Sequence, residues 1–598
     1  MKNGKKCTTF DKIVEGCRKI NQFILFCGRI SVLLQKIIEA PIRATYYITA
    51  MKKLLLSLSL TLLVMAVHAQ PPKHEVRAVW LTTIGGIDWP RTHATSTSSI
   101  RDQQRELTRI LDQLKKANVN TVLLQTRVRA TTIYPSQFEP YDPCLTGKQG
   151  GNPGYDPLRF AIDECHKRGM ELHAWVVTIP VGKWNSAGCK ALRNRYPSLI
   201  HKIGDEGFMN PEMEETGNYI AKICREITDK YDVDGIHLDY IRYPETWKMQ
   251  VSKERGRQYI TDIVKKIHRS VKQRKRWVKL SCSPIGKFSD LSRYSSKGWN
   301  AYNTVCQDAQ RWLREGLMDE LFPMMYFRGD NFYPFAINWK EHTYGRIIAP
   351  GLGIWFLARS EGNWPLSDIT RELEFLRNNG LGHTYFRSRF FTDNTKGIYD
   401  YVRNRLDTYP ALIPALTWEH STPPQAPRRL FIDSSNDITL YWDGATDNSD
   451  GDYLTYNVYV SHTGTVDIRD SRNLVAHRVM GNSIRFRGSS SHAPLYFAVT
   501  AVDRYGNESS PLQSAAEARA SQQLLRNDGR RLFLPKKDPA LDANFVVIES
   551  LAGNIVKREY YQDVIDIHDL PEGVYSIHSM NRSKKTHRLG HFIVKRGD

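Results

Sequence analysis

The side chains best suited to chemistry stand in the stretch DVDGIHLDYIRYP, residues 232–244. The apolar run GIHL predicts a short buried strand, and the carboxylate of Asp239 ends it. Because side chains alternate along a strand, Gly235, His237 and Asp239 share one face, and two large aliphatic residues share the other. A carboxylate at the end of a strand could act as a nucleophile or stabilise a positive charge that develops in a transition state.

The neighbours of Asp239 each have a structural and a chemical interpretation. His237 lies one layer deeper than Asp239, and we interpret it as a hydrogen-bonded core residue. Asp234 has the opposite parity and stands at the start of the strand, where we interpret it as a cap. Arg242 follows closely, so one alternative is a salt bridge that occupies Asp239, and the other is a free carboxylate beside a binding arginine.

Polar and aromatic side chains also end other expected strands. A sugar presents C–H bonds that stack on aromatic rings and hydroxyl groups that bond to amides and guanidinium groups. The mixture therefore suits a carbohydrate ligand. The candidate substrate-binding residues are Gln125, Arg127, His173, Trp175, Tyr240, Arg242, Tyr243, Tyr326 and Trp355.

The elements that must position these residues alternate between strand-like and helix-like patterns. Eight strands, mostly separated by helices, predict an α/β fold, a (β/α)₈ TIM barrel over residues 70–420. A doubly wound open sheet is the alternative, but no glycine-rich phosphate loop follows the first strand. The expected strands are RAVWLTT, NTVLLQTRV, ELHAWVV, the stretch that ends at Asp239, KLSCSP, DELFPMMYF, RIIAPGLGIWF and GHTYFRSRFF. The first expected helix is SIRDQQRELTRILDQLKKA, the second runs from Asp156-Pro157 to Gly169, and the third begins at Asn210-Pro211. Further helices are expected over residues 254–270, 302–316 and 367–378. Barrel enzymes keep their chemistry at the C-terminal mouth, which is where Asp239 is expected.

Four stretches carry a family resemblance: NTVLLQTRVRATTIYPSQFEP, LTGKQGGNPGYDPLRFAIDECHKRGMELHAW, NPEMEETGNYIAKICREITDKYDVDGIHLDYIRYP and QDAQRWLREGLMDELFPMMYF. Over roughly residues 73–420 the chain resembles the glycosyl-hydrolase-like family 10 proteins, secreted bacterial barrels related to α-amylase-like glycosidases. The resemblance implies hydrolysis of O-glycosidic bonds in a polysaccharide, with peptidoglycan glycan strands as one substrate class. It places Asp239 at the fourth-strand carboxylate, beside Arg242 and Tyr243. The chain departs from the family pattern after HAW, where Val176-Val177-Thr178-Ile179-Pro180 stands in place of Asn-Pro.

A glycosidase normally uses two carboxyl groups, separated by about 5–5.5 Å for retention of configuration and about 6.5–9.5 Å for inversion. Asp239 is the first. Asp330, in RGDNF after the sixth strand, matches the position where related barrels often place the acid, and Glu361 and Glu245 are the alternatives. No metal or other cofactor is expected, because a proton donor and a carboxylate suffice.

A non-catalytic carbohydrate-binding or adhesive protein is the alternative function. It would need only the aromatic platform, and the departure after HAW is compatible with it. An enzyme would need a second Asp or Glu within about 10 Å of Asp239, and that requirement separates the two.

Residues 51–69 have the parts of a secretion signal. Lys52 and Lys53 open MKKLLLSLSLTLLVMAVHAQ, an apolar run too short for a membrane anchor follows, and VHA supplies a cleavage site. We expect a mature chain from Gln70 that is secreted, periplasmic or on the cell surface, with no membrane span. Residues 1–50 precede a complete signal and are interpreted as an artefact of the assigned start. The alternative is an anchor built on FILFCGRISVLL.

The net charge limits the classes of binding partner, and the cysteine pattern bears on metal sites and disulfides. The formal net charge is +21, and residues 1–70 carry +8 of it, which leaves +13 on the remainder. That surplus favours anionic surfaces or acidic polymers, but no arginine-rich run interleaved with aromatic residues predicts nucleic-acid binding. Six of the nine cysteines follow residue 70, scattered and without a CxxC pair, so neither a zinc site nor a disulfide scaffold is expected.

Composition changes after the barrel. STPPQAP, residues 421–427, predicts an extended linker, and the short aromatic strands of 428–520 predict a β-sandwich that resembles a fibronectin type III module. Its acidic stretch DNSDGD, residues 447–452, lacks the twelfth-position Glu of a calcium loop and is interpreted as a turn between strands. Residues 531–598 resemble the C-terminal sorting domain of type IX secretion substrates, which implies the secretion machinery as a partner. A second small adhesive sandwich is the alternative.

Overall fold

The computed structural model describes residues 70–294, 297–433, 438–486, 495–514, 525–537, 543–550, 554–571, 573–581 and 586–594. The chain divides into two compact units, Met1–Gln70 and Pro71–Asp598, and all the described helices and strands belong to the second. The predicted secretion signal and the extension before it lie outside the described residues. No helix among the described residues is long and apolar enough to cross a membrane.

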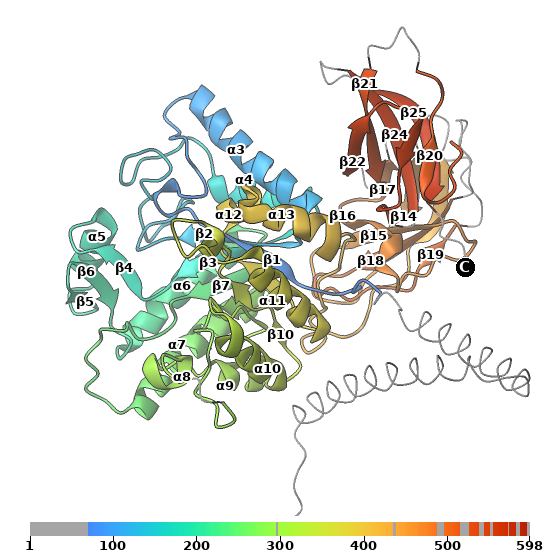
Figure 1. The fold of residues 1–598 in the computed structure, drawn as a ribbon. Coiled ribbons are helices and arrows are strands. Elements are labelled where there is room, and N and C mark those ends of the chain that lie inside the picture. The colour runs from blue at the N-terminus through green and yellow to red at the C-terminus, as the bar shows by residue number, and fades with distance from the viewer. Residues whose placement is uncertain are drawn as a thin grey trace, which may run out of the picture. The chain divides into compact units, whose positions relative to one another are not determined.

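A parallel sheet forms the barrel (Figure 1). Its strand order is β10-β9-β8-β7-β3-β2-β1-β12-β11. β10 and β11 are the two halves of one segment, residues 347–352, which pairs with β9 at its start and with β12 at its end. The sheet therefore closes, and the predicted TIM barrel is confirmed. Its strands are β1 (Arg77–Leu81), β2 (Thr121–Arg127), β3 (Glu171–Val177), β7 (Gly235–Asp239), β8 (Lys279–Cys282), β9 (Glu320–Leu321), β10 (Ile347–Ile348), β11 (Gly351–Leu352) and β12 (His383–Tyr385).

Helices cover the outer face of this sheet (Figure 1). Apolar residues at helical spacing bury one face of α3, and Ser96 caps its first turn. Asp156 caps α4 with Pro157 at its first position, as the sequence predicts. The long helices are α3 (Thr97–Lys116), α4 (Pro157–His166), α6 (Glu214–Lys230), α7 (Lys253–Lys272), α10 (Tyr333–Glu341) and α11 (Leu366–Asn378). Shorter helices are η1 (Ile84–Gly86), α8 (Ala301–Thr304), α9 (Ala309–Arg314), η2 (Gly329–Asn331), η3 (Ile354–Leu357), α12 (Ser388–Thr392), η4 (Thr395–Gly397), α13 (Ile398–Tyr401) and the π-helical η5 (Val402–Leu406).

Two helix predictions need correction. α6 begins at Glu214 rather than at Asn210-Pro211, because the side chain of Asn210 accepts a hydrogen bond from the backbone N–H of Glu212 and forms a turn instead. The pattern over 302–316 forms two short helices, α8 and α9, with a break between them.

An excursion separates β3 from α6. It contains β4 (Pro180–Lys183), α5 (Ala187–Arg195), β5 (Ile200–Ile203) and β6 (Glu206–Met209), and its three strands form a separate antiparallel sheet in the order β4-β6-β5 (Figure 1). The backbone N–H of Met209 donates to the carbonyl oxygen of Ile179 at 2.8 Å, which returns the chain to the end of β3.

The residues after the barrel form small antiparallel sheets, as predicted. β14 (Ile438–Asp443) lies between β13 (Arg428–Asp433) and β17 (Ser483–Phe486), and a second sheet has the order β16-β15-β18-β19. Trp442 of one sheet and Tyr456 of the other share a hydrophobic core, which is how a sandwich packs. The second sheet contains β15 (Thr455–Ser461), β16 (Leu474–Val479), β18 (Tyr496–Val502) and β19 (Leu512–Gln513), with η6 (Ser471–Asn473) between β15 and β16.

The C-terminal region has two further antiparallel sheets, in the orders β20-β23 and β22-β21-β24-β25. The resemblances to a fibronectin module and to a sorting domain stay predictions, because strand order and packing fit many small sandwiches. The strands are β20 (Arg531–Phe533), β21 (Ala543–Ser550), β22 (Ile555–Tyr560), β23 (Val564–Asp566), β24 (Gly573–Asn581) and β25 (Thr586–Val594).

Buried ion pairs close the N-terminal end of the barrel. Lys279 at the start of β8 lies 2.6 Å from Glu171 at the start of β3. Asp234 accepts the backbone N–H of Leu172 at 2.9 Å and pairs with Arg478 of β16. Asp234 is therefore a structural cap, as the sequence predicts, and its charge also holds the β15–β18 sheet on the barrel.

Candidate active site at the barrel mouth

Asp239 ends β7 at the C-terminal mouth of the barrel, and its side chain is half-buried. Three neutral donors hold its carboxylate. The ring N–H of Trp175 donates to Oδ2 at 3.2 Å, and the hydroxyl of Ser283 and the backbone N–H of Tyr240 donate to Oδ1 at 2.9 and 2.7 Å. No described residue forms an ion pair with Asp239. Both oxygens are thus oriented as acceptors while the group keeps access to the mouth.

Strand register explains why these donors converge. β7 lies between β3 and β8, so Val177 of β3 is level with Asp239, and Leu238 is level with Cys282 of β8. The residue after Cys282 therefore lies beside Asp239 and points inward. Alternation along β7 is as predicted, because Ile236 and Leu238 pack in the core under the helices.

Tyr240 has a backbone conformation that is rare for its type. Its φ is +56°, in the left-handed region, which is costly for a residue with a bulky side chain. This turn points the Tyr240 N–H back at the Asp239 carboxylate and brings the Tyr240 ring to 3.8 Å from the guanidinium of Arg242. Strained backbone of this kind concentrates at functional sites, where surrounding contacts maintain it.

Arg242 pairs with Glu245 and not with Asp239. Nη2 of Arg242 lies 2.7 Å from Oε1 of Glu245, and the Tyr240 hydroxyl donates to the other oxygen of the same carboxylate. The positive charge of Arg242 and these hydrogen bonds hold the pKa of Glu245 below its usual value against the opposing effect of burial. The salt-bridge alternative for Asp239 therefore does not occur.

An aromatic wall stands beside the carboxylate. The rings of Tyr326 and Trp355 meet edge to face with centroids 4.5 Å apart, and Phe386 contacts both. Burial and the negative charge of Asp239 raise the pKa of Tyr326 well above its usual value, so its hydroxyl stays protonated and can donate. Both Tyr326 and Trp355 are partly exposed, as a sugar-stacking surface requires.

Two predicted binding residues of β2 point to structural partners. The Oε1 atom of Gln125 accepts the backbone N–H groups of Thr83 and Ile84 at 3.0 and 2.8 Å and so holds the loop after β1. Arg127 is fully buried and pairs with Glu139 at 2.7 Å. Neither joins the group around Asp239.

Three other residues of the candidate set also lie apart from the aromatic wall. His173 is fully buried toward the N-terminal end of β3, away from the mouth, and its Nε2 lies 3.1 Å from Glu171. The Tyr243 ring is buried, and its hydroxyl donates to Glu212 at 3.3 Å. Arg242 is buried between the rings of Tyr240 and Trp299.

His237 occupies the layer below Asp239 and is fully buried. The ring N–H of Trp80 lies 3.1 Å from its Nε2, and the hydroxyl of Ser281 lies 3.0 Å from its Nδ1. Because Trp80 can only donate, Nε2 must accept, and the proton belongs on Nδ1. Burial lowers the pKa of His237 well below its usual value, with a further contribution from His173. It is a neutral core residue, as predicted.

The three candidates for a second carboxyl differ in their surroundings. Asp330 lies exposed in η2, the helix after β9, and no described residue forms a hydrogen bond or ion pair with its side chain. Glu361 is exposed in the loop after η3. Glu245 is occupied by Arg242 and Tyr240.

Ser283 and Phe386 contribute to the site and were missed from the sequence. Alternation from Lys279 through Ser281 to Ser283 in KLSCSP could have revealed Ser283, because it shares the inward face with the same parity as Asp239. Phe386 follows β12, and no pattern in GHTYFRSRFF distinguishes it from its aromatic neighbours.

Known proteins similar to this chain carry related names. The family profile described as "Glycosyl hydrolase-like 10" matches residues 75–343. Glycosyl hydrolase DigH of Escherichia coli strain K12 is 30% identical over 293 residues, which cover 43% of this chain and 67% of that protein. The chain belongs to the glycosyl hydrolase-like 10 family. The predicted family resemblance is confirmed, and membership supports a function of the glycoside hydrolase type.

Other similarities extend beyond the glycosyl hydrolase-like 10 region. Glycosyl hydrolase YngK of Bacillus subtilis strain 168 is 26% identical over 480 residues, covering 73% of this chain and 92% of that protein. Among solved structures, the glycoside hydrolase domain of PgaB (BpsB) from Bordetella bronchiseptica has a TM-score of 0.39 with 12% identity, covering 55% of this chain and 98% of that one.

Proposed function

We propose that the protein hydrolyses O-glycosidic bonds in a polysaccharide, with Asp239 as one of two catalytic carboxyl groups. One observation carries the proposal: Asp239 stands half-buried at the barrel mouth, with three neutral donors and no ion-pair partner among the described residues. A structural carboxylate at a strand end would normally have its charge neutralised, as Asp234 does at the other end of β7. Asp239 is oriented and left uncompensated.

That geometry suits a nucleophile or an electrostatic stabiliser. Cleavage of a glycosidic bond passes through an oxocarbenium-like transition state whose positive charge is strongest at the moment of bond breaking. A fixed carboxylate beside the anomeric carbon stabilises that charge without reorganising. Trp175, Ser283 and Tyr240 hold Asp239 in one orientation, and the rings of Tyr326 and Trp355 offer a face for the sugar.

Asp330 is the proposed proton donor to the leaving group. A general acid must be protonated at the working pH, and Glu245 is a poor choice because Arg242 lowers its pKa. Glu361 remains the alternative, since it too lies in a segment that follows a barrel strand.

The proposed substrate is a glycan outside the cytoplasm, and peptidoglycan glycan strands are one candidate. The secretion signal predicted at 51–69 and the family membership support this choice. The small β sheets that follow the barrel suit a spacing or adhesive role next to such a polymer, and the predicted sorting domain would deliver the chain to the cell surface.

A carbohydrate-binding protein without catalysis is the second candidate. The observation that favours it is that no described carboxyl group contacts the Asp239 carboxylate directly. The chain also departs from its family after β3, where Thr178 donates from its backbone and its hydroxyl to the carbonyl oxygen of Asp239.

A panel of polysaccharides that includes purified peptidoglycan separates the two candidates. New reducing ends on at least one polymer, released by the wild-type chain in proportion to its concentration, would support the enzyme. Retention on a polymer with no reducing ends over a day of incubation would support the binder. No retention and no release on any polymer would contradict both.

A further inference from the structure

A cluster of potential metal ligands joins the end of the barrel region to the sandwich that follows it. His420 precedes the linker, Asp447 lies in the turn after β14, and Asp503 follows β18. One possible ligand atom from each of the three lies within 4.8 Å of the other two. Two ligands of a tetrahedral ion, with bonds of about 2.1 Å, stand about 3.4 Å apart, so an inward adjustment of the side chains would suffice.

The negative charge in this cluster has no counter-charge among the described residues. Asp503 is 5% exposed, and neither Asp503 nor Asp447 forms an ion pair with a described residue. Buried charges in proteins are paired or coordinate metals, and no Lys or Arg among the described residues forms an ion pair with Asp503.

His420 contributes a second, independent observation. Its Nε2 atom is shielded from solvent and has no hydrogen-bond partner within the described ranges. An orphaned buried ring nitrogen is uncommon and needs an explanation, because burial without a partner costs free energy. A neutral imidazole can donate the lone pair of such a nitrogen to a metal ion, and the two carboxylates would share that ion.

Hydrogen bonds hold the three ligand segments together independently of any ion. The side-chain N–H of Asn507 donates to Oδ2 of Asp503 at 2.9 Å and to the carbonyl oxygen of His420 at 3.0 Å. The backbone N–H of Gln425 donates to the carbonyl oxygen of Thr446, next to Asp447, at 2.9 Å. The ligands are therefore positioned before an ion arrives, which reduces the cost of binding one.

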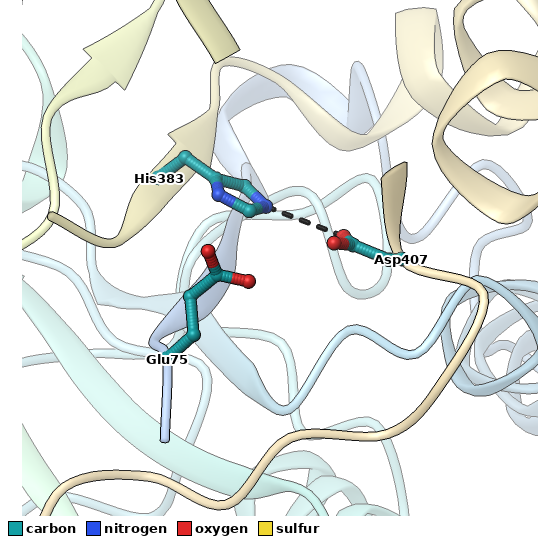
Figure 2. A group of neighbouring side chains, drawn as sticks. All are labelled: Glu75, His383 and Asp407. Carbon is teal, nitrogen blue, oxygen red and sulfur yellow. Dashed lines mark hydrogen bonds and ion pairs between the residues drawn. The ribbon is translucent and has the colours of Figure 1, made fainter. Parts of the chain in front are cut away.

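Glu75, His383 and Asp407 form a second cluster of the same kind, but its electrostatics are opposite. Figure 2 shows its three side chains together, with His383 turned toward Asp407. Arg77 lies 2.7 Å from Glu75 and 3.2 Å from Asp407, and Arg377 pairs with the same two carboxylates. Two guanidinium groups already neutralise that cluster and would repel a cation.

We propose that His420, Asp447 and Asp503 bind one divalent transition-metal ion, with zinc as the best match. Calcium and magnesium prefer sites made only of oxygen ligands, whereas one imidazole and two carboxylates suit zinc. Water completes the coordination, because Asp447 also lines a surface hollow with Asp452 and Asn482. The ion ties the segment before the linker to two loops of the sandwich and so fixes the sandwich to the barrel.

The test measures zinc bound to the purified, untagged full-length chain by equilibrium dialysis against ZnCl₂ with elemental analysis. We expect one zinc ion per chain and a rise in Tm on addition of zinc. His420→Ala and Asp447→Asn should each weaken zinc binding by about tenfold or more and should abolish the rise in Tm. Asp503→Asn should do the same, but Asp503 also accepts two backbone N–H groups of its turn, so the first two variants carry the test.

His568→Ala is the matched control, because His568 is an exposed histidine that pairs with Asp566 outside the cluster. It should bind zinc as the wild-type chain does. Three results would overturn the proposal: no stoichiometric zinc on the wild-type chain, equal zinc on His420→Ala and Asp447→Asn, or binding of CaCl₂ that is unchanged in His420→Ala.

Discussion

The guanidinium of Arg242 lies 2.7 Å from Oε1 of Glu245, stacks on the ring of Tyr240, and forms no ion pair with Asp239. The sequence places the two acidic residues at similar separations from Arg242, so the choice between them decides what Asp239 can do. With Glu245 as the partner of Arg242, the strand-end carboxylate keeps its charge available at the mouth.

Ser283→Ala should reduce turnover without unfolding the barrel. The variant removes one of the three donors to Asp239, a hydrogen bond worth about 1 kcal/mol. If the bond orients the carboxylate in the transition state, kcat should fall about fivefold to tenfold with KM nearly unchanged. Steady-state kinetics on the polymer that the panel identifies would measure this.

Ser281→Ala is the control for that variant. Ser281 shares the strand and the inward face with Ser283, but it contacts His237 one layer deeper. It should lower Tm and leave kcat within about twofold. Equal losses of kcat in both variants would mean that Ser283 acts through the barrel interior rather than on Asp239.

Asp330→Asn should discriminate between natural polymers and substrates with activated leaving groups. A general acid is needed only where the departing oxygen requires a proton, so an aryl glycoside with a nitrophenol leaving group bypasses it. We expect a loss of about 100-fold or more on the polymer and a much smaller loss on the aryl glycoside. Glu361→Gln, tested in parallel, should behave as the wild-type chain. The reverse pattern would assign the acid to Glu361.

Arg127→Met should affect stability rather than binding. Arg127 is fully buried, and its guanidinium donates to Glu139 and to the carbonyl oxygens of Val177 and Thr178. Removing it leaves the buried Glu139 unpaired, which typically costs about 3–5 kcal/mol. Denaturant unfolding would measure the loss, and KM at low temperature should change little.

Arg129→Met supplies the matched comparison, because Arg129 is 40% exposed and its pair with Glu206 at 3.2 Å is solvated. It should cost less than about 1 kcal/mol. A large rise in KM for Arg127→Met without a loss of stability would contradict this prediction and would show that Arg127 binds substrate.

Glu372→Gln should change how stability depends on pH. Glu372 lies on α11, 1% exposed, and burial with the charge of Asp368 raises its pKa from 4.5 to about 9. Between pH 4.5 and about 9 the folded chain holds a proton that the unfolded chain has lost, so the contribution of Glu372 to stability falls as pH rises across that window.

The Gln variant does not titrate, so its stability relative to the wild-type chain should increase from pH 5 to pH 8. The relative gain is on the order of 4 kcal/mol, from about 1.4 kcal/mol for each of the three pH units. Thermal unfolding of both chains in matched buffers at several pH values would measure it. Parallel curves would contradict the raised pKa.

Much of the fold follows from local patterns in the sequence. Alternation in GIHLD placed Asp239 and His237 on the inward face, and the structure agrees in both cases. Helix α4 begins where Asp156 and Pro157 predict it, because capping is a local interaction between neighbouring residues. Local rules therefore identify the strands, the helices and the direction of the side chains.

The partners of polar residues do not follow from local patterns. Gln125 and Arg127 have the parity and position of binding residues, yet loops distant in the sequence supply Thr83 and Glu139 as their partners. Arg242 likewise pairs with Glu245 and not with Asp239, because the chain takes a left-handed turn at Tyr240. Each pairing depends on how a loop folds back, and that depends on the packing of the whole barrel.

The measurement that tests the central claim most directly is turnover and melting temperature of Asp239→Asn on the same sample. Asparagine has nearly the same shape and can accept one of the hydrogen bonds, so Tm and affinity for the polymer should change little. It carries no negative charge, so kcat should fall by about three orders of magnitude or more. A chain that keeps most of its activity and loses stability instead would contradict the claim, because Asp239 would then be part of the scaffold.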